Sequence, residues 1–284
     1  MFVQLAFLSR MAKACIVLSL YAFLGVTYAF SFDTVFVPPN ISHEAWNELL
    51  TRYVDGRGLV AYAAWKENQN DLSALDRYLK QFAETPRTPA SGNDAAASLI
   101  NLYNAATIRW ILTNYPIESI QSRNDSFTAK RYDVGGRKAS LDDIEKGTLR
   151  ALLGYRAHAV LVCAAHSCPP LQRFAYLPSR LDEQIETAYR VWLARPDLNR
   201  FSPAEKRIEI SKIFDWYKQD FDKSGRTAKI LAQYGPPEDR DFLASGAFSI
   251  SYLPYNWALN DQGRPGKEYG LPQIARDRLF HLFQ

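Results

Sequence analysis

The chain has 284 residues and a formal net charge of only +4, from 34 Lys and Arg against 30 Asp and Glu. So weak an excess gives no electrostatic basis for binding nucleic acid. The length suits one large domain, or one domain with additions.

The N-terminus has the pattern of an export signal. The apolar run Ala14–Ala29 follows Arg10 and Lys13 and ends in a small-x-small pattern typical of signal cleavage. We expect a signal peptide over residues 1–29, a single domain over 30–284 and a periplasmic or secreted location. The run is long, so an uncleaved N-terminal anchor is the alternative. Cleavage would lower the net charge to +2 and leave no apolar run that could span a membrane.

The first half of the chain is predicted to be helical. Apolar residues recur at helical spacing over 42–53, with Ser42 as a candidate N-cap, and again over 70–82 and 96–114. The last of these helices ends before a proline and carries Asn101 and Asn104 on its apolar face. A buried amide without partners costs about 1–3 kcal/mol. Both asparagines should therefore belong to a hydrogen-bond network, either bracing a neighbouring loop or contacting a ligand.

Two local signals follow. Residues 131–139 resemble a β-hairpin around Gly135-Gly136. Ser140 and Asp143 then form a capping-box pattern that opens a helix. Glu145 falls on the apolar stripe of that helix, which is unusual because most glutamates are exposed. We therefore expect Glu145 to be a buried acid.

The remaining elements complete an α+β prediction. The sequence predicts a helix-rich single domain around a small antiparallel sheet, with a core of about 40–261. Strands are expected over 157–163 and within 248–261; helices are expected over 178–194, 202–222, 227–234 and the C-terminal 271–284.

The segment 156–174, RAHAVLVCAAHSCPPLQRF, holds the richest chemistry. In a regular strand His158 and Cys163 would face opposite ways. Cys168, before two prolines, would sit at a helix start, where free amides lower the pKa of a thiol. Cys168, His158 and a third group such as Glu145 would then make a nucleophile site.

Three other interpretations of this segment stay open. Cys163 and Cys168 could form a disulfide in an exported protein. Together with His158 and His166 they have the atoms for zinc, although the spacing is unfamiliar. The corner could also be purely structural.

Five segments resemble, in order, the signature blocks of the domain of unknown function 547 family: INLYNAATI, LDDIEKGTLR, RAHAVLVCAAHSCPPL, ISKIFDWYKQDF and ISYLPYNWALN. The resemblance runs from about Asn40 to Asp261. It implies a shared site of Glu145, His158 and Cys168, with Asn101 and Asn104 nearby.

The order of helix and strand is also similar to papain-like and transglutaminase folds. In those folds the nucleophilic cysteine lies on the helix, whereas here that helix carries Asn101 and Asn104 and no cysteine. A nucleophile would have to be Cys168, which argues against protease activity.

Two functions are therefore expected. The first is a thiol-dependent hydrolase or acyltransferase acting on an amide or thioester, without cofactor or metal. The second is a catalytically silent envelope domain that binds a peptide or small molecule in the same groove.

Overall fold

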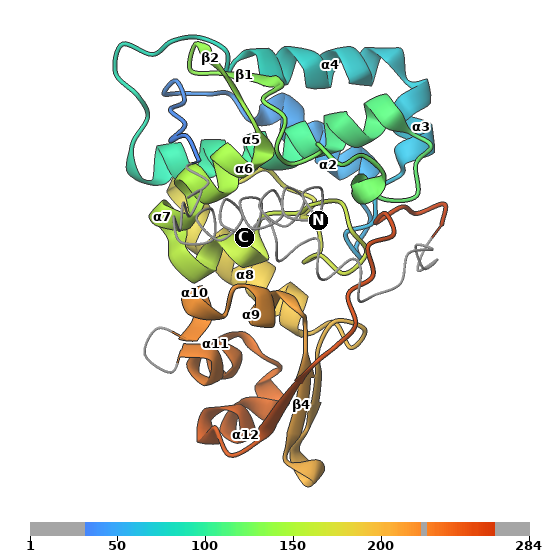
Figure 1. The fold of residues 1–284 in the computed structure, drawn as a ribbon, viewed down its shortest axis with the longest axis vertical. Helices are drawn as coiled ribbons and strands as arrows, with labels where there is room; N and C mark the ends of the chain where they lie inside the picture. Colours follow the sequence, from blue (N-terminus) through green and yellow to red (C-terminus); the bar gives the residue numbers. More distant parts are fainter. Residues whose placement is uncertain (1–31, 223–225, 265–284) are drawn as a thin grey trace, which may run out of the picture. The chain divides into compact units, whose positions relative to one another are not determined.

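The computed structural model describes residues 32–222 and 226–264, and within them the chain is α+β (Figure 1). The α-helices and strands are the following: α2 (Glu44–Tyr53), α3 (Tyr62–Glu67), α4 (Gln69–Lys80), α5 (Gly92–Asn114), β1 (Tyr132–Val134), β2 (Arg137–Ala139), α6 (Leu141–Ile144), α7 (Arg150–Leu153), α8 (Leu181–Leu193), β3 (Arg200–Ser202), β4 (Arg207–Ile210), α9 (Ile213–Trp216), α10 (Lys218–Asp222), α11 (Arg226–Tyr234), α12 (Arg240–Ser245) and β5 (Ser249–Tyr252).

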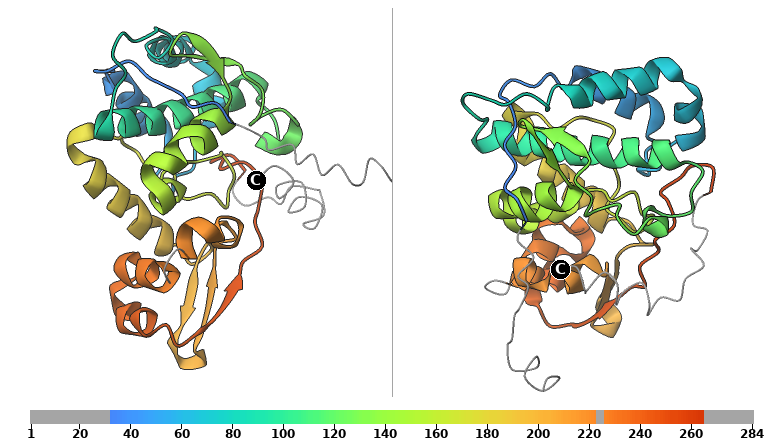
Figure 2. Two further views of the ribbon diagram at one scale, coloured as in Figure 1. Left: turned by 60° about the vertical axis from the view of Figure 1, so that its left-hand side comes forward. Right: turned by 45° about the horizontal axis from the view of Figure 1, so that its top comes forward.

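Helix α5 is the centre of the core and is buried around almost its whole circumference. It packs against α3, α4, α6 and α7 (Figure 2). The predicted helix over 96–114 is confirmed and starts four residues earlier, at Gly92. The predicted helices over 42–53 and 70–82 are also confirmed as α2 and α4, although the residue before α2 is His43 and not Ser42.

The local signals in the middle of the chain are confirmed. Strands β1 and β2 pair antiparallel around Gly135 and Gly136, which both have positive φ as a tight two-residue turn requires. Ser140 and Asp143 form the reciprocal capping box that opens α6.

The expected helix from Ser202 onward was wrong in its first part. Strand β3, a 3₁₀ turn at Pro203–Glu205 and strand β4 occupy residues 200–210, and β4 pairs with β5 in parallel, so this three-stranded sheet is mixed. The single turn of 3₁₀ helix ends at Lys206, which has a φ of 47°, and the sequence RIEI then alternates with Ile208 and Ile210 fully buried. Helices α9 and α10 occupy the rest of the range.

The strand predicted over Ala157–Cys163 is also wrong. Gly154–Ala159 is a 3₁₀ helix, the next residues have no regular structure, and no helix begins at Cys168. The run from Ala157 to Val162 is buried on all sides. A continuous apolar run of this length does not reveal its conformation through periodicity.

In the part of the chain that the structure describes, no helix combines the length and the apolar character needed to cross a bilayer. The predicted signal peptide and the predicted C-terminal helix over 271–284 lie outside the described residues.

Candidate functional site

The two asparagines of α5 bind the backbone on either side of the irregular segment from Cys163 to Cys168, which we call the corner. Asn104 Oδ1 accepts the N–H of Val162 at 2.9 Å, and its Nδ2 donates to the carbonyl of Val160 at 2.9 Å. Asn101 binds the N–H and carbonyl of Tyr176 in the same way, at 2.9 and 2.8 Å. The amides therefore replace the ladder that a strand would have provided, as the bracing interpretation expected. Their predicted contact with a ligand stays a prediction.

The corner brings the two thiols together. The N–H of Cys163 donates to Cys168 Sγ at 3.2 Å, and Tyr255 Oη lies 3.1 Å from Cys168 Sγ and 3.4 Å from Cys163 Sγ. Ala164, between Cys163 and Ala165, has a φ of 64°. A left-handed residue can turn the amides on either side of it toward one point, and here the N–H groups of Cys163 and Ala165 both face the Cys168 sulfur.

The two thiols differ in acidity. Burial alone would raise the pKa of Cys168, but hydrogen bonds from the Cys163 thiol, Tyr255 and the backbone of Ala165 and Cys163 lower it. The hydrogen bond to Cys168, together with burial, raises the pKa of Cys163. Both cysteines are free. Cys168 is therefore the more acidic thiol, although its donors come from a loop and a tyrosine instead of a helix start.

The strand that was expected to turn Cys163 away from His158 does not form, and Cys163 contacts Cys168 directly.

Glu145 is buried, as its place on the apolar stripe predicted. It begins a π-helix, Glu145–Leu149, inserted between α6 and α7. Such wide turns are rare in proteins as a whole, and those that do occur are often at functional sites. Tyr217 Oη donates to Glu145 Oε1 at 2.8 Å, and Tyr103 Oη donates to Oε2 at 3.1 Å. Two buried hydroxyl donors make Glu145 a well-satisfied carboxylate.

His158 pairs with Asp220 of α10. Its Nε2 lies 2.8 Å from Asp220 Oδ2, and Arg150 Nε donates to the same oxygen at 2.9 Å. Burial lowers the pKa of His158 more than Asp220 raises it. Burial would raise the pKa of Asp220, but the hydrogen bonds from His158 and Arg150 outweigh burial and hold this pKa below its usual value. A neutral ring whose Nε2–H faces a carboxylate leaves Nδ1 as a proton acceptor.

Tyr217 joins the acid and the imidazole. Its hydroxyl binds Glu145, and its ring lies with its centroid 4.0 Å from that of His158. The structure therefore brings Glu145 and His158 together. It does not join Cys168 to His158: among the described residues, the polar contacts of the Cys168 sulfur are with Cys163, Ala165 and Tyr255.

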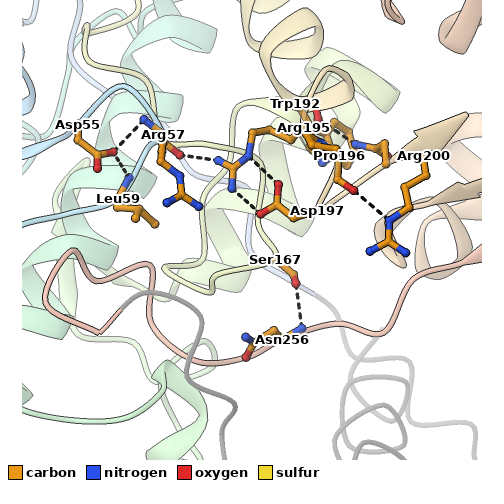
Figure 3. A network of polar contacts seen from close by, with 11 residues as sticks. Asp55, Arg57, Leu59, Ser167, Trp192, Arg195, Pro196, Asp197, Arg200 and Asn256 are labelled. Carbon is orange, nitrogen blue, oxygen red and sulfur yellow. Dashed lines mark hydrogen bonds and ion pairs between the residues drawn. The ribbon is translucent and has the colours of Figure 1, made fainter.

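Cys168 also lines a hollow of about 200 Å³, a volume that includes space open to solvent. The polar groups around it come from the corner, from the loop after α2, from the chain after α8 and from the segment after β5: Arg57, His166, Cys168, Arg195 and Asn260. Figure 3 shows Arg57 and Arg195 as neighbours, with Arg195 bound to the Arg57 carbonyl and to Asp197. Over the described ranges 32–222 and 226–264, no group of three or more His, Cys, Asp or Glu side chains is arranged to hold a metal ion.

Sequence reasoning assigned no role to Tyr217, Asp220 or Tyr255, which contact the predicted site residues. The signal was present, because Tyr217 and Asp220 lie in the block ISKIFDWYKQDF and Tyr255 lies in ISYLPYNWALN. Both blocks carry polar side chains among large apolar ones, the pattern of buried hydrogen-bonding groups.

Comparison with known proteins adds one finding. Neither the curated proteins nor the solved structures compared with this chain give a significant match. Residues 88–193 match a family model described as a protein of unknown function, DUF547. That range contains Asn101, Asn104, Glu145, His158 and Cys168. Through residues 88–193, the chain carries a domain of the DUF547 family.

Proposed function

We propose that the protein is an exported thiol-dependent hydrolase or acyltransferase that uses Cys168 as its nucleophile on a thioester or amide. The observation that carries the proposal is the surroundings of the Cys168 sulfur, which accepts hydrogen bonds from the Cys163 N–H and from Tyr255 and borders a hollow. Donors of this kind favour the thiolate, which is the nucleophilic form.

In the proposed reaction the Cys168 thiolate attacks the acyl carbon, a new C–S bond forms, and the bond to the leaving group breaks. Water, in a hydrolase, or an acceptor nucleophile, in a transferase, then attacks the acyl-enzyme. This second step transfers the acyl group, releases a proton and restores the thiolate.

The geometry favours the thioester over the amide. An amine leaving group must be protonated as it departs, whereas a thiol with a pKa of about 8.5 departs readily as the anion. Cys168 has no hydrogen bond to His158 in the described structure, so this imidazole is not placed to protonate a leaving group at the sulfur. His158 and Glu145 are assigned positioning roles, because both contact Tyr217 and neither contacts the thiol.

Alkylation with iodoacetamide tests the proposal, and Cys168→Ser and Cys163→Ser form a matched pair. Labelling should map to Cys168, persist in Cys163→Ser and vanish in Cys168→Ser. Incubation with a simple acetyl thioester should add one acetyl group to the same residue, seen by mass spectrometry. Equal labelling of both thiols in the folded protein would contradict the asymmetry.

A silent binding domain is the second candidate, and one observation favours it: only 3% of Cys168 is exposed. A Cys168 that resists both iodoacetamide and the thioester in the native protein would support this candidate. Export is tested separately, by N-terminal sequencing of material from the culture medium or periplasm. A mature chain that starts near Phe30 is expected, and one that starts at Met1 would reject export.

A further inference from the structure

The loop between α2 and α3 lies directly against the cysteine corner. Gly58 has a φ of 77°, and a Cβ at this position would be 2.6 Å from the N of Leu171 and 2.7 Å from Cα of Pro170. Only glycine permits so close an approach. The loop is therefore packed on the residues that follow Cys168, and Arg57 is held at the edge of the hollow.

The backbone of this loop is fixed at three points. Asp55 Oδ1 accepts the N–H groups of Arg57 and Leu59, each at 2.9 Å. From the end of α8, Arg195 Nη1 donates to the carbonyl of Arg57 at 2.8 Å (Figure 3). These contacts use the main chain of Arg57 and leave its guanidinium out of the scaffold.

The charge of the hollow is unbalanced. Arg195 is neutralised by Asp197, through contacts of 2.8 and 2.6 Å. Of the described residues, none forms an ion pair with the Arg57 guanidinium, and the lining of the hollow contains no carboxylate. Burial lowers the pKa of His166, and Arg195 and Arg57 add to that effect against the pull of Asp197. His166 is therefore neutral at pH 7, and Arg57 contributes the uncompensated positive charge.

We infer that the hollow takes acyl substrates that carry an anionic group, a carboxylate or a phosphate, and that Arg57 binds this group while the acyl carbon faces Cys168. The inference rests on the proposed function of Cys168 and adds the substrate class. A planar guanidinium on a fixed loop suits such a group, because it can donate two parallel hydrogen bonds to carboxylate or phosphate oxygens.

Two alkylating reagents that differ in charge test the inference. Iodoacetate and iodoacetamide form the same C–S bond and expel the same iodide, but only iodoacetate is an anion. The measured quantity is the ratio of their rates at Cys168, in the native protein and in Arg57→Gln. The ratio should fall by about threefold in Arg57→Gln, the size of one charge interaction at an exposed site. The difference should shrink as salt is added.

Arg180→Gln is the matched control. It removes the same charge from an exposed arginine that directly precedes α8, a helix of 13 residues whose other end leads to Arg195. Its rate ratio should equal that of the native protein. If Arg57→Gln leaves the ratio unchanged while iodoacetamide still labels Cys168, the anionic substrate is rejected and the nucleophile stands.

A failure of the proposed nucleophile can also be told apart from a failure of the anion site. If neither reagent labels Cys168, the proposed nucleophile fails, and titration with inorganic phosphate tests the anion site alone. Saturable NMR shifts of the Gly58 amide and the His166 ring, lost in Arg57→Gln, would support an anion site. Their absence in the native protein would overturn it.

Discussion

Replacement of Asn104 by alanine should destabilise the protein through the backbone of the cysteine corner. The side chain makes two hydrogen bonds of 2.9 Å, one to the N–H of Val162 and one to the carbonyl of Val160. Both valines are buried, with 4% and 1% of their surface exposed. Asn104→Ala leaves one buried donor and one buried acceptor without a partner.

The expected cost follows from those two groups. Each unsatisfied buried polar group costs about 1–3 kcal/mol, so the pair gives roughly 2–6 kcal/mol before relaxation. Water entering the vacated space would recover part of this cost. We therefore expect a loss of about 3 kcal/mol in the free energy of unfolding, measured by urea denaturation at pH 7. The midpoint should move while the slope with denaturant is preserved.

Thr107→Val is the matched control on the same helix. Within the described residues the buried Thr107 hydroxyl finds no hydrogen-bond partner, so its replacement by an isosteric methyl removes no interaction. This variant should be as stable as the native protein or slightly more so. A loss below about 1 kcal/mol for Asn104→Ala, or equal losses for both variants, would refute the bracing role.

Three further outcomes are expected. In Glu145→Gln the pKa of His158 should fall, because the Glu145 charge raises it; identical NMR titrations would exclude this coupling. Burial lowers the pKa of His43 to about 4, so its contribution is present above pH 6.5 and is lost as the pH falls through 4. The free energy of unfolding should therefore fall by roughly 3 kcal/mol between pH 6.5 and pH 4. His43→Gln should abolish this fall, and a fall of the same size in the variant would show that another group is responsible. Tyr255→Phe removes a donor to the thiolate and should raise the pKa of Cys168, shifting the iodoacetamide rate profile to higher pH; an unmoved profile would show that the hydroxyl is not a donor.

The parts of the fold that the sequence predicts well have local causes. The capping box of Ser140 and the hairpin at Gly135-Gly136 involve residues only a few positions apart. Helix α5 has a long, continuous pattern that ends before a proline. Each of these signals acts within one element, so a reading of one chain segment is sufficient.

The corner could not be predicted in this way because distant residues determine it. The backbone around Val160 is satisfied by Asn104, 56 residues away, instead of by a neighbouring strand. The partner of His158 is Asp220, 62 residues along the chain, and the partner of Cys168 is Tyr255, 87 residues along. The alternation of side chains could not give these pairs.

Residues 88–193 contain Glu145, His158 and Cys168, but the groups that engage their polar atoms lie partly outside this range. Tyr217 and Asp220 come from α9–α10 and Tyr255 from the segment after β5. The corner itself is bonded to that last segment, through the N–H of Ser167 to the carbonyl of Asn256 and the N–H of Asn256 to Ser167 Oγ. The candidate site is therefore completed by the C-terminal part of the domain.

The surroundings of Cys168 differ from those of a cysteine that only fills space. A packing cysteine behaves as a small apolar residue and needs no donors around its sulfur. Here the Cys163 N–H and the Tyr255 hydroxyl both form hydrogen bonds with that sulfur. Ala164, at a φ of 64°, lies between Cys163 and Ala165, whose amides face the sulfur. A left-handed alanine costs about 1–2 kcal/mol, and strain of this kind is typical of sites where the conformation serves a function. A corner that merely turned the chain would be more stable with glycine at this position, and the retained strain argues for a role of the thiolate.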